Sequence, residues 1–448
     1  MSAPLSPLIQ QMVSLMEART NGADPGTGIL PRLNSAADML GGVDRIPREL
    51  INYVQGKQLA LFGDYPSGKD TAPSAIFMVV FFFIFLAHLT LFGINWSRGH
   101  KFLLSFGFAF YALLRVVGFA LRVAWSREIT RVQVGIASEV FLIIPTILLA
   151  SFNLILAQRL FTWRHPYVGS SKLFWGALLT VYSVVISVVV MTIVAAVVPY
   201  VYLLSHRNYE MSKNVVKVSS ILVILYSLLA TGLILVSYLF KPTKRDKGCL
   251  IYQPTWLESF SPTYFPLKDS AKQHEQIFIG RNGAAAFAST RIIASSYHYN
   301  AQSDVLPEPT AENLKLEPGN EDNLVRYSSS TGQLKHNYSI IIVTLTTTFI
   351  LIGAVFRAIT CFLDRTVETQ SWIFKPVVMY MLWGFLETVI NVIYLLGRID
   401  LRFYRPDRFP KDMLVGNEAV EPSPVISNKE RTSSISERTS NPEIVRTV

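Results

Sequence analysis

The sequence of 448 residues is 50% hydrophobic and 16% charged, and its mean hydropathy is +0.35. These values are atypical of a soluble domain and indicate a membrane protein. The formal net charge is +10. Many of the basic residues lie beside apolar segments, where they are expected at a membrane surface, so the charge gives no reason to expect a nucleic-acid partner.

Residues 1–72 precede the first long apolar run and mix short amphipathic pieces with Gly and Pro breaks. One such piece is Pro47-Arg-Glu-Leu-Ile-Asn-Tyr-Val54. The pattern predicts an N-terminal segment with short amphipathic helices that lie near the membrane. The start of the sequence does not combine a basic stretch with a following apolar run, so we expect the first span itself to direct insertion.

The stretch Gly63-Asp-Tyr-Pro-Ser-Gly-Lys-Asp70 resembles a phosphate-binding loop, but its chemistry does not fit. Asp70 stands where a hydroxyl should hold magnesium, and Pro73 with a membrane span follows in place of a helix packed on a sheet. The histidines form no metal-binding spacing, and the sequence has no Gly-x-Ser-x-Gly motif. We therefore expect no cofactor, no metal and no enzyme activity.

Seven near-continuous apolar runs follow, each long enough to cross about 30 Å of hydrocarbon, which takes roughly 20 helical residues. A backbone exposed to lipid must satisfy its hydrogen bonds within its own segment, and the runs lack the alternation of barrel strands. The fold class is therefore all-α: a polytopic integral membrane protein in a lipid bilayer, with five transmembrane helices in residues 73–240 and two in residues 338–397. The expected spans are Ala75–Ile94, Phe102–Ala124, Ile136–Gln158, Phe174–Leu204, Val216–Phe240, Tyr338–Phe362 and Ile373–Gly397.

The basic residues predict the orientation of the chain. Lys and Arg are more numerous on the side that holds the loop at residues 241–337 and the tail at residues 398–448. Because basic residues favour the cytosolic side, we expect residues 1–72 to be exoplasmic and the C-terminus to be cytosolic, in the plasma membrane or an endomembrane. The composition of the loop predicts partial disorder, and that of the basic, Ser/Thr-rich tail predicts disorder throughout.

Two arginines lie inside the second span. Arg115 and Arg122 are seven residues apart, so they share one face of the helix, one near mid-membrane and one near the outer end. A charge at the centre of a bilayer costs about 2.5 to 3.5 kcal/mol and normally faces a partner or a wet cavity. The sequence therefore predicts polar partners for both arginines in other spans.

Two other spans supply such partners. The third span carries a stripe with a period of seven residues, formed by Glu139, Thr146 and Asn153. The seventh span carries a polar face at four- and three-residue steps, formed by Glu387, Asn391 and Tyr394. From the matching depths we predict two contacts, between Arg122 and Glu139 and between Arg115 and Glu387, in a polar core shared by the second, third and seventh spans.

Two interpretations of this core are open. The charges form structural ion pairs that fix helix register, or they line a substrate or ligand cavity together with Asn153 and Asn391. In the second case Pro145 and Pro199 are candidate kinks that open the helix packing. Arg122 has a further alternative, because a long side chain near a helix end can reach the headgroups.

The third span, Ser138-Glu-Val-Phe-Leu-Ile-Ile-Pro-Thr-Ile-Leu-Leu-Ala-Ser-Phe-Asn-Leu-Ile-Leu-Ala-Gln-Arg159, resembles the fungal lipid-translocating exporter family. That family has an apolar run that reaches a proline, then small residues and a terminal arginine, here Pro145, Ala150, Ser151 and Arg159. Similar positions in the second and sixth spans are Gly118, Arg122, Phe356 and Arg357. The fourth span lacks the polar residues of the family. The chain is more similar still to fungal seven-span proteins without assigned function, some of them labelled receptor-like.

These resemblances imply two classes of function. The first implies a non-ATP-driven transporter or exporter of lipid-like amphiphiles, with an amphipathic small molecule or lipid as substrate. The second implies at most a receptor-like sensor of the G-protein-coupled type, with a cytosolic signalling partner at residues 241–337. A structural membrane scaffold is the third alternative, and topology alone does not distinguish among the three.

Overall fold

The computed structural model describes residues 6–169, 171–241, 243, 257, 259–270 and 337–404. In this part of the chain the regular structure is helical, apart from one isolated antiparallel bridge between Leu59 and Thr366. Of the described helices, 7 are long and apolar enough to cross a membrane, which confirms the expected all-α multi-pass architecture. The orientation of the termini stays a prediction. Most of the loop at residues 241–337 and the tail after residue 404 lie outside the described residues.

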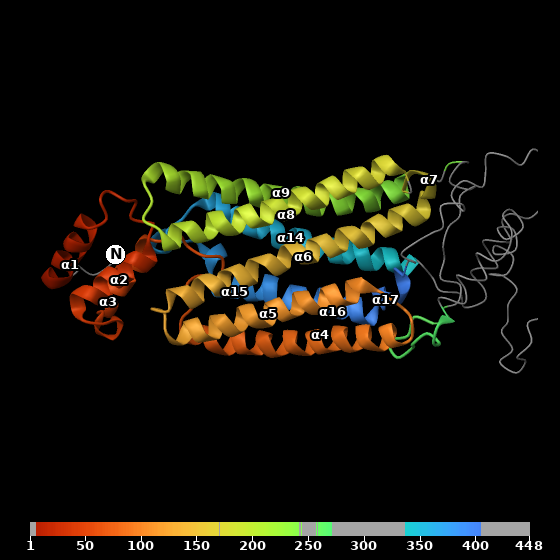
Figure 1. Cartoon of the computed structure of the whole chain (residues 1–448), viewed down its shortest axis with the longest axis horizontal. Helices are drawn as coiled ribbons and strands as arrows, with labels where there is room; N and C mark the ends of the chain where they lie inside the picture. The colour runs from red at the N-terminus through yellow and green to blue at the C-terminus, as the bar shows by residue number, and fades with distance from the viewer. Residues whose placement is uncertain are drawn as a thin grey trace, which may run out of the picture. The chain divides into compact units, whose positions relative to one another are not determined.

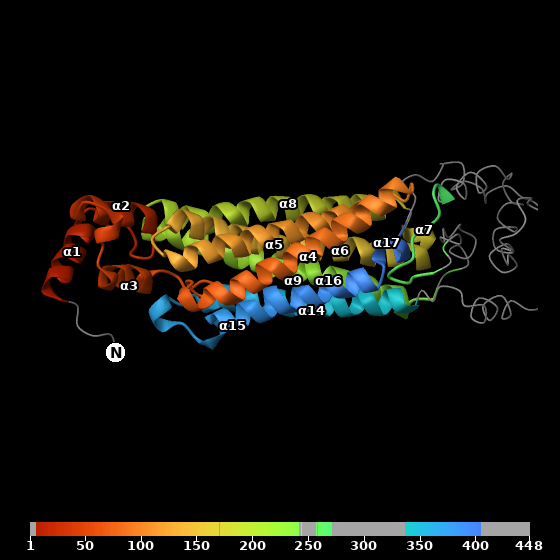
Figure 2. The ribbon, with the colours of Figure 1, turned by 90° about the horizontal axis from the view of Figure 1, so that it is seen from below.

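Six of these helices are continuous and the seventh contains an irregular turn. The six are α4 (Thr71–Ser97), α5 (Leu103–Arg127), α6 (Val132–Arg164), α8 (Lys172–Val201), α9 (His206–Leu239) and α14 (Asn337–Leu363). Helix α5 packs between α4 and α6, and α9 packs against α6, α8 and α14, as Figure 1 and Figure 2 show. The short α7 (Pro166–Gly169) lies between α6 and α8.

The last span comprises α15 (Pro376–Met379), a π-helical turn (Tyr380–Leu386) and α16 (Glu387–Leu396), and α17 (Ile399–Arg402) follows. Turns of π-helix widen the backbone and are frequent at functional sites. Gly384 lies within this turn, and a Cβ atom there would come within 2.6 Å of the Phe77 ring of α4. A side chain at this position would therefore force the Phe77 ring to move.

The two candidate kink residues, Pro145 and Pro199, lie inside α6 and α8, and each helix continues past its proline. The irregular turn in the last span was not predicted from the sequence. Its backbone widens at Tyr380–Leu386, where the sequence has no proline to mark the change. The role of the two prolines in opening the helix packing stays a prediction.

A cap of three short helices precedes the bundle: α1 (Pro7–Ala18), α2 (Ile29–Leu40) and α3 (Arg48–Lys57). The cap has a small hydrophobic core of its own, formed by Ile9, Met16, Ala36, Ile46 and Leu50. Gly28 and Gly41 flank α2 with φ angles of 66° and 75°, in the left-handed region that glycine adopts at little cost. These glycines let the chain turn sharply at both ends of α2.

Backbone hydrogen bonds tie the cap to the bundle at two places. The amide of Gly28 donates to the Pro199 carbonyl at the end of α8, at 2.7 Å. The amide of Ala60 donates to the Arg365 carbonyl at 2.8 Å, next to the Leu59–Thr366 bridge. The segment between the cap and α4 contains Gly63–Asp70, the stretch that resembles a phosphate-binding loop. The Asp70 carboxylate accepts hydrogen bonds from the Ser67 amide and hydroxyl. These hydrogen bonds form a capping box at the 3₁₀ turn Gly68–Asp70, which leads directly into α4.

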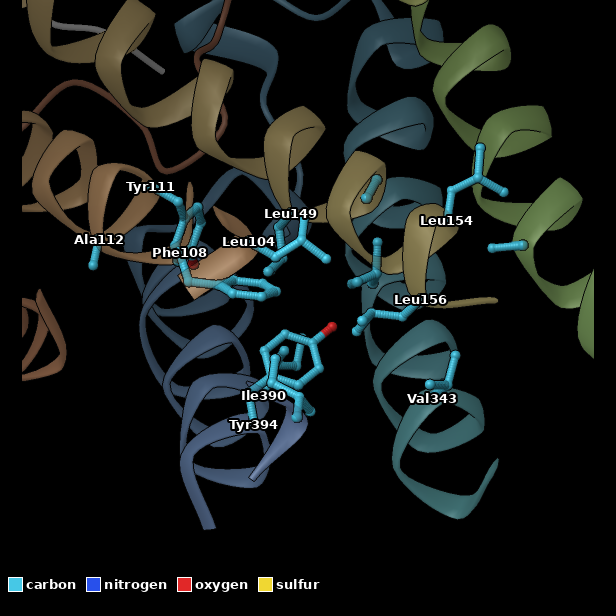
Figure 3. Close-up of a cluster of buried hydrophobic side chains, with 14 of the residues drawn as sticks. Leu104, Phe108, Tyr111, Ala112, Leu149, Leu154, Leu156, Val343, Ile390 and Tyr394 are labelled. Atoms are coloured by element: carbon cyan, nitrogen blue, oxygen red, sulfur yellow. The ribbon is translucent and has the colours of Figure 1, made fainter. Parts of the chain in front are cut away.

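The main core of the bundle lies between α5, α6, α14 and α16. Figure 3 shows Phe108 of α5 next to Tyr394 of α16, with ring centroids 4.8 Å apart. Leu149, Leu154 and Leu156 of α6 are also almost completely buried. Because this core is dense and apolar, the polar groups inside it must find partners among themselves.

Candidate functional site

Arg115 and Glu387 form an ion pair in the interior of the bundle, with side chains 0% and 6% exposed. Arg115 Nε donates to Glu387 Oε2 at 2.7 Å, and Arg115 Nη2 donates to Oε1. The other donors of this guanidinium reach the Leu142 carbonyl at 2.7 Å and the Thr146 hydroxyl at 2.9 Å. Each nitrogen of the Arg115 guanidinium therefore donates to an acceptor, and the Glu387 carboxylate compensates its charge.

The Glu387 carboxylate likewise has hydrogen-bond donors around it. Besides Arg115, its carboxylate accepts hydrogen bonds from the Tyr111 hydroxyl and from Thr146 Oγ1, the latter at 3.4 Å. The Trp383 ring covers the pair, with the Arg115 guanidinium 5.3 Å from its centroid. A carboxylate offers about four acceptor positions, and here they are filled by protein groups.

Arg122 and Glu139 form the second pair nearer the cap, and their contact is weaker. Arg122 Nη1 lies 3.4 Å from Glu139 Oε1. The remaining contacts of the Arg122 guanidinium are the Gly63 carbonyl, the Asp64 carbonyl at 3.1 Å and the Tyr380 hydroxyl at 3.4 Å. Arg122 is thus fully buried among protein acceptors, which does not fit the alternative in which it reaches the headgroups.

The two carboxylates differ in how much acceptor capacity is left. Within the described residues, Glu139 receives a hydrogen bond from Arg122 alone, and its side chain is 13% exposed. The charge of Arg357 also acts on Glu139. Because one long contact fills only part of the capacity of a carboxylate, Glu139 can accept further hydrogen bonds and Glu387 cannot.

Glu139 lines a cavity between the cap and the neighbouring ends of α5, α6 and α8. The cavity has an empty volume of about 700 Å³, including the part open to solvent. Its wall is mostly apolar and is built from the cap (Met16, Ile29, Leu33, Ala36, Ile46, Leu50, Ile51, Val54) and from the bundle side (Leu61, Trp125, Ile129, Val132, Ile136). An apolar pocket with a few polar groups is the usual form of a small-molecule site.

Two tyrosines of the cavity wall lie near Glu139, and Arg32, Gln55 and Thr130 are the other polar residues of the wall. Tyr65 and Tyr200 line the cavity, and the Glu139 charge acts on both. The buried Tyr65 hydroxyl has no hydrogen-bond partner among the described residues. Burial raises the pKa of the Tyr65 phenol well above its usual value, and the neighbouring Tyr200 and Glu139 add to the shift. Tyr65 therefore stays neutral and can donate a hydrogen bond at any physiological pH.

Asn153 is the centre of a third polar group in the bundle. Its Oδ1 accepts hydrogen bonds from the Thr346 and Tyr394 hydroxyls, both at 3.0 Å, and its Nδ2 donates to the Thr347 hydroxyl. These contacts join α6, α14 and α16. All four side chains are buried, so the cluster satisfies its own hydrogen bonds and leaves no site for a ligand.

Asn391 lies one turn from Glu387 on α16. Its Nδ2 donates to the Glu387 carbonyl at 2.7 Å. Among the described residues, neither its Oδ1 nor the Nε2 of His88 on α4 has a hydrogen-bond partner. Asn391 is 0% exposed and His88 is 1% exposed. Both residues therefore belong to the interior of the bundle and not to the wall of the cavity.

The structure contains both ion pairs that the sequence predicts, and it places Glu139 in the cavity wall. Arg115, Asn153, Glu387 and Asn391 lie deeper, in the packed interior. The sequence pattern did not indicate the cap residues of the cavity, Tyr65, Tyr111 or the threonines of α14. Tyr111 precedes Arg115 by one helical turn, and Thr346 and Thr347 stand in a run of hydroxyl residues, so these two features were visible in the sequence. Among the described residues no cluster of three or more His, Cys, Asp or Glu side chains fits a metal ion.

The described part of the chain has seven membrane-length helices around a buried polar core, which define a polytopic α-helical membrane protein. Residues 166–404 match the family described as "protein of unknown function (DUF3112)". The match covers slightly more than half of the chain, and the chain belongs to this family. No curated protein and no solved structure matches the sequence. The matched residues include Glu387, Asn391 and the segment that leads into α17, whereas Arg122 and Glu139 precede them.

Proposed function

We propose that the protein is a non-ATP-driven transporter of lipid-like amphiphiles, and that the cavity under the cap is its binding site. The observation that carries this proposal is the Glu139 carboxylate, which has acceptor capacity left and lies in a mostly apolar wall. An amphiphile has the matching chemistry, since its chain removes apolar surface from water and its head needs a hydrogen-bonding group.

The position of the cavity supports the same proposal. Glu139 lies in the second turn of α6, and the cavity lies where the cap meets the ends of the membrane-length helices. The polar head of an amphiphile lies at this level of a membrane, where the hydrocarbon meets the interface. A ligand could therefore enter from the bilayer with its head beside Glu139 and its chain along Trp125 and Ile136.

The two ion pairs have different roles in this proposal. The Arg115–Glu387 pair holds α5 against α16, because each of its groups is bonded to protein and closed to solvent. The Arg122–Glu139 pair holds the carboxylate in place for a ligand. Arg122 is anchored by the Gly63 and Asp64 carbonyls, so the guanidinium that contacts Glu139 is in place before the ligand arrives.

A receptor-like sensor is the second candidate. The observation that favours it is the tightly packed Arg115–Glu387 pair beneath the cavity. A ligand bound under the cap meets this packed interior and need not cross the membrane to act. The two candidates differ in whether the bound molecule moves from one leaflet to the other.

The test uses the purified full-length protein in liposomes with a labelled sphingoid base and a labelled phospholipid. We expect the wild type to move one of these lipids between leaflets, and Glu139→Gln to slow the movement while inserting normally. The control is Glu128→Gln, because Glu128 forms an exposed pair with Arg131 outside the cavity wall. Binding without movement favours the sensor, and neither binding nor movement rejects both proposals for these lipids.

A further inference from the structure

Residues 259–270, here called the strap, lie against the end of the bundle opposite the cap. Figure 1 shows this segment in green beside α17, at the far end of α4 from the cap. Most of the strap is exposed or half-buried, and Pro266 is buried. The strap comes from the long loop between α9 and α14, yet three arginines from other parts of the chain bind it.

Arg398 makes the largest number of contacts with the strap. Its Nη1 donates to the carbonyls of Ser261 and Pro262, both at 3.1 Å, and to that of Tyr264. Its Nε and Nη2 donate to the Asp400 carboxylate at 3.0 and 2.8 Å. Arg398 is 0% exposed and has a φ angle of 46°. A long side chain in the left-handed region is unfavourable by itself, so these contacts hold it there.

Arg98, at the end of α4, binds the other half of the strap. Its Nη1 donates to the carbonyls of Pro266 at 3.1 Å and Phe265 at 3.5 Å. In return the Asp269 amide donates to the Arg98 carbonyl at 2.9 Å. The Arg98 and Arg398 guanidinium carbons lie 5.4 and 5.0 Å from the centroid of the Phe265 ring. Phe265 therefore joins both arginines by cation–π contacts.

Asp400 connects these contacts to the rest of the bundle end. Its carboxylate accepts a hydrogen bond from Asn95 Nδ2 of α4 at 2.7 Å, and its carbonyl is 2.8 Å from His100 Nε2. Arg402 of α17 lies 4.0 Å from the centroid of the Phe260 ring in the strap. The strap, the end of α4 and α17 thus form one continuous network.

The type of contact makes the strap separable from the bundle. The arginines bind it through backbone carbonyls and ring faces, which water can replace when the segment leaves. Segments with much exposed backbone and few buried apolar contacts are the first to open in a folded protein. The Arg398–Asp400 pair joins two residues at the end of the bundle, so Arg398 connects the strap to α17.

We propose that the strap is a releasable closure of this end of the bundle. The proposal rests on the proposed transport function, which requires that the cavity end and the strap end open at different times. In the described structure the cavity lies at the cap end, and the strap covers the ends of α4 and α17. Release of the strap removes all three carbonyl acceptors of Arg398 Nη1 and loosens α17 against α4 through Asp400 and Asn95.

The test is hydrogen–deuterium exchange on the full-length protein in nanodiscs, which needs no substrate. Phe265→Ala removes the ring shared by Arg98 and Arg398. We expect exchange in residues 259–270 to become faster on the order of tenfold, together with faster exchange at Asn95–Lys101 and in α17. The matched control is Leu267→Ala, because Leu267 lies in the same strap and is 67% exposed. It should leave all three regions unchanged.

Two results overturn the proposal. Faster exchange in the strap alone means that the contact is local and closes nothing, and unchanged exchange in Phe265→Ala means that this ring does not hold the strap. A transport assay on the same variants separates this proposal from the proposed function. Coupled opening of the strap, α4 and α17 in a protein that moves no lipid supports the closure and rejects the transporter.

Discussion

The Arg115 guanidinium of α5 donates two hydrogen bonds to the Glu387 carboxylate of α16, and both side chains are closed to solvent. These two residues are far apart in the sequence, and their contact joins the second and last spans in the middle of the bundle. The charges therefore stabilise the assembly of the helices only as a pair.

Removal of one partner of this pair should be more harmful than removal of both. Glu387→Gln leaves the Arg115 charge without a counter-charge, and we expect a loss of about 3 to 5 kcal/mol in the free energy of unfolding. Replacing both residues by Met should cost less than this single change. Thermal unfolding in detergent compares the stability of the wild type, Glu387→Gln and the double Met variant. The control is Glu368→Gln, because Glu368 forms an exposed pair with Lys57. A fully stable Glu387→Gln would contradict the assigned role.

The cluster around Asn153 should stabilise the folded state, because its hydrogen bonds are all made inside the protein. Asn153→Ala leaves the Thr346 and Tyr394 hydroxyls without their acceptor, and we expect a loss of about 1 to 3 kcal/mol. Thr348→Val is the control, because the exposed Thr348 hydroxyl bonds only to the Thr344 carbonyl of its own helix. Equal stability of the two variants in the same unfolding assay would reject the role of the cluster in joining α6, α14 and α16.

A methyl group at Gly135 should disturb the cavity wall. A Cβ atom there would come within 2.3 Å of the Trp125 ring, and both residues line the cavity. Because a packed ring must move to make room, we expect Gly135→Ala to cost about 1 to 3 kcal/mol and to weaken binding of the amphiphile. Gly176→Ala is the control, since nothing lies within 4 Å of a Cβ atom at that position. Unchanged binding in Gly135→Ala would place the ligand elsewhere.

The pH dependence of stability should include a contribution from Asp364, which follows α14. Burial favours a higher pKa for this carboxyl, but hydrogen bonds from Lys213 and Lys217, each at 3.1 Å, outweigh it and lower the pKa. The folded state therefore binds this proton less tightly than the unfolded state, whose pKa is about 3.9. The stabilisation is present above that value and is lost as the pH falls through the lower folded pKa.

We therefore expect Asp364→Asn to unfold more easily than the wild type at neutral pH. The difference should shrink when unfolding is followed through the acid range below about pH 3.9. A difference that stays constant down to the lowest pH would show that the charge of Asp364 is not the cause.

The helical architecture and the two ion pairs follow from the sequence because their signals are local. Apolar runs of membrane length predict transmembrane helices directly. The seven-residue spacing of Arg115 and Arg122 places both residues on one face of their helix. A buried charge requires a partner, and Glu139 and Glu387 are the carboxylates at matching depth. The pairing could therefore be predicted without knowing how the helices pack.

The cavity could not be predicted in this way, because it depends on where the cap lies. Leu50 and Ile51 form part of an amphipathic pattern whatever they pack against, and only the folded chain brings them opposite Trp125 and Glu139. The binding of the strap is equally non-local. It depends on backbone carbonyls as acceptors for Arg98 and Arg398, and every residue has a carbonyl, so the sequence carries no mark of it.

The central claim is that the cavity beside Glu139 binds an amphiphile. Photo-crosslinking tests it most directly, with a photoactivatable sphingoid base and a photoactivatable phospholipid added to the full-length protein in nanodiscs. Peptides labelled by one of the two probes should come from Leu50–Val54 and Trp125–Glu139, the segments that form the cavity wall. Glu139→Gln should reduce this labelling relative to Glu128→Gln. Labelling confined to lipid-facing surfaces such as that of α8, and equal in both variants, would contradict the claim.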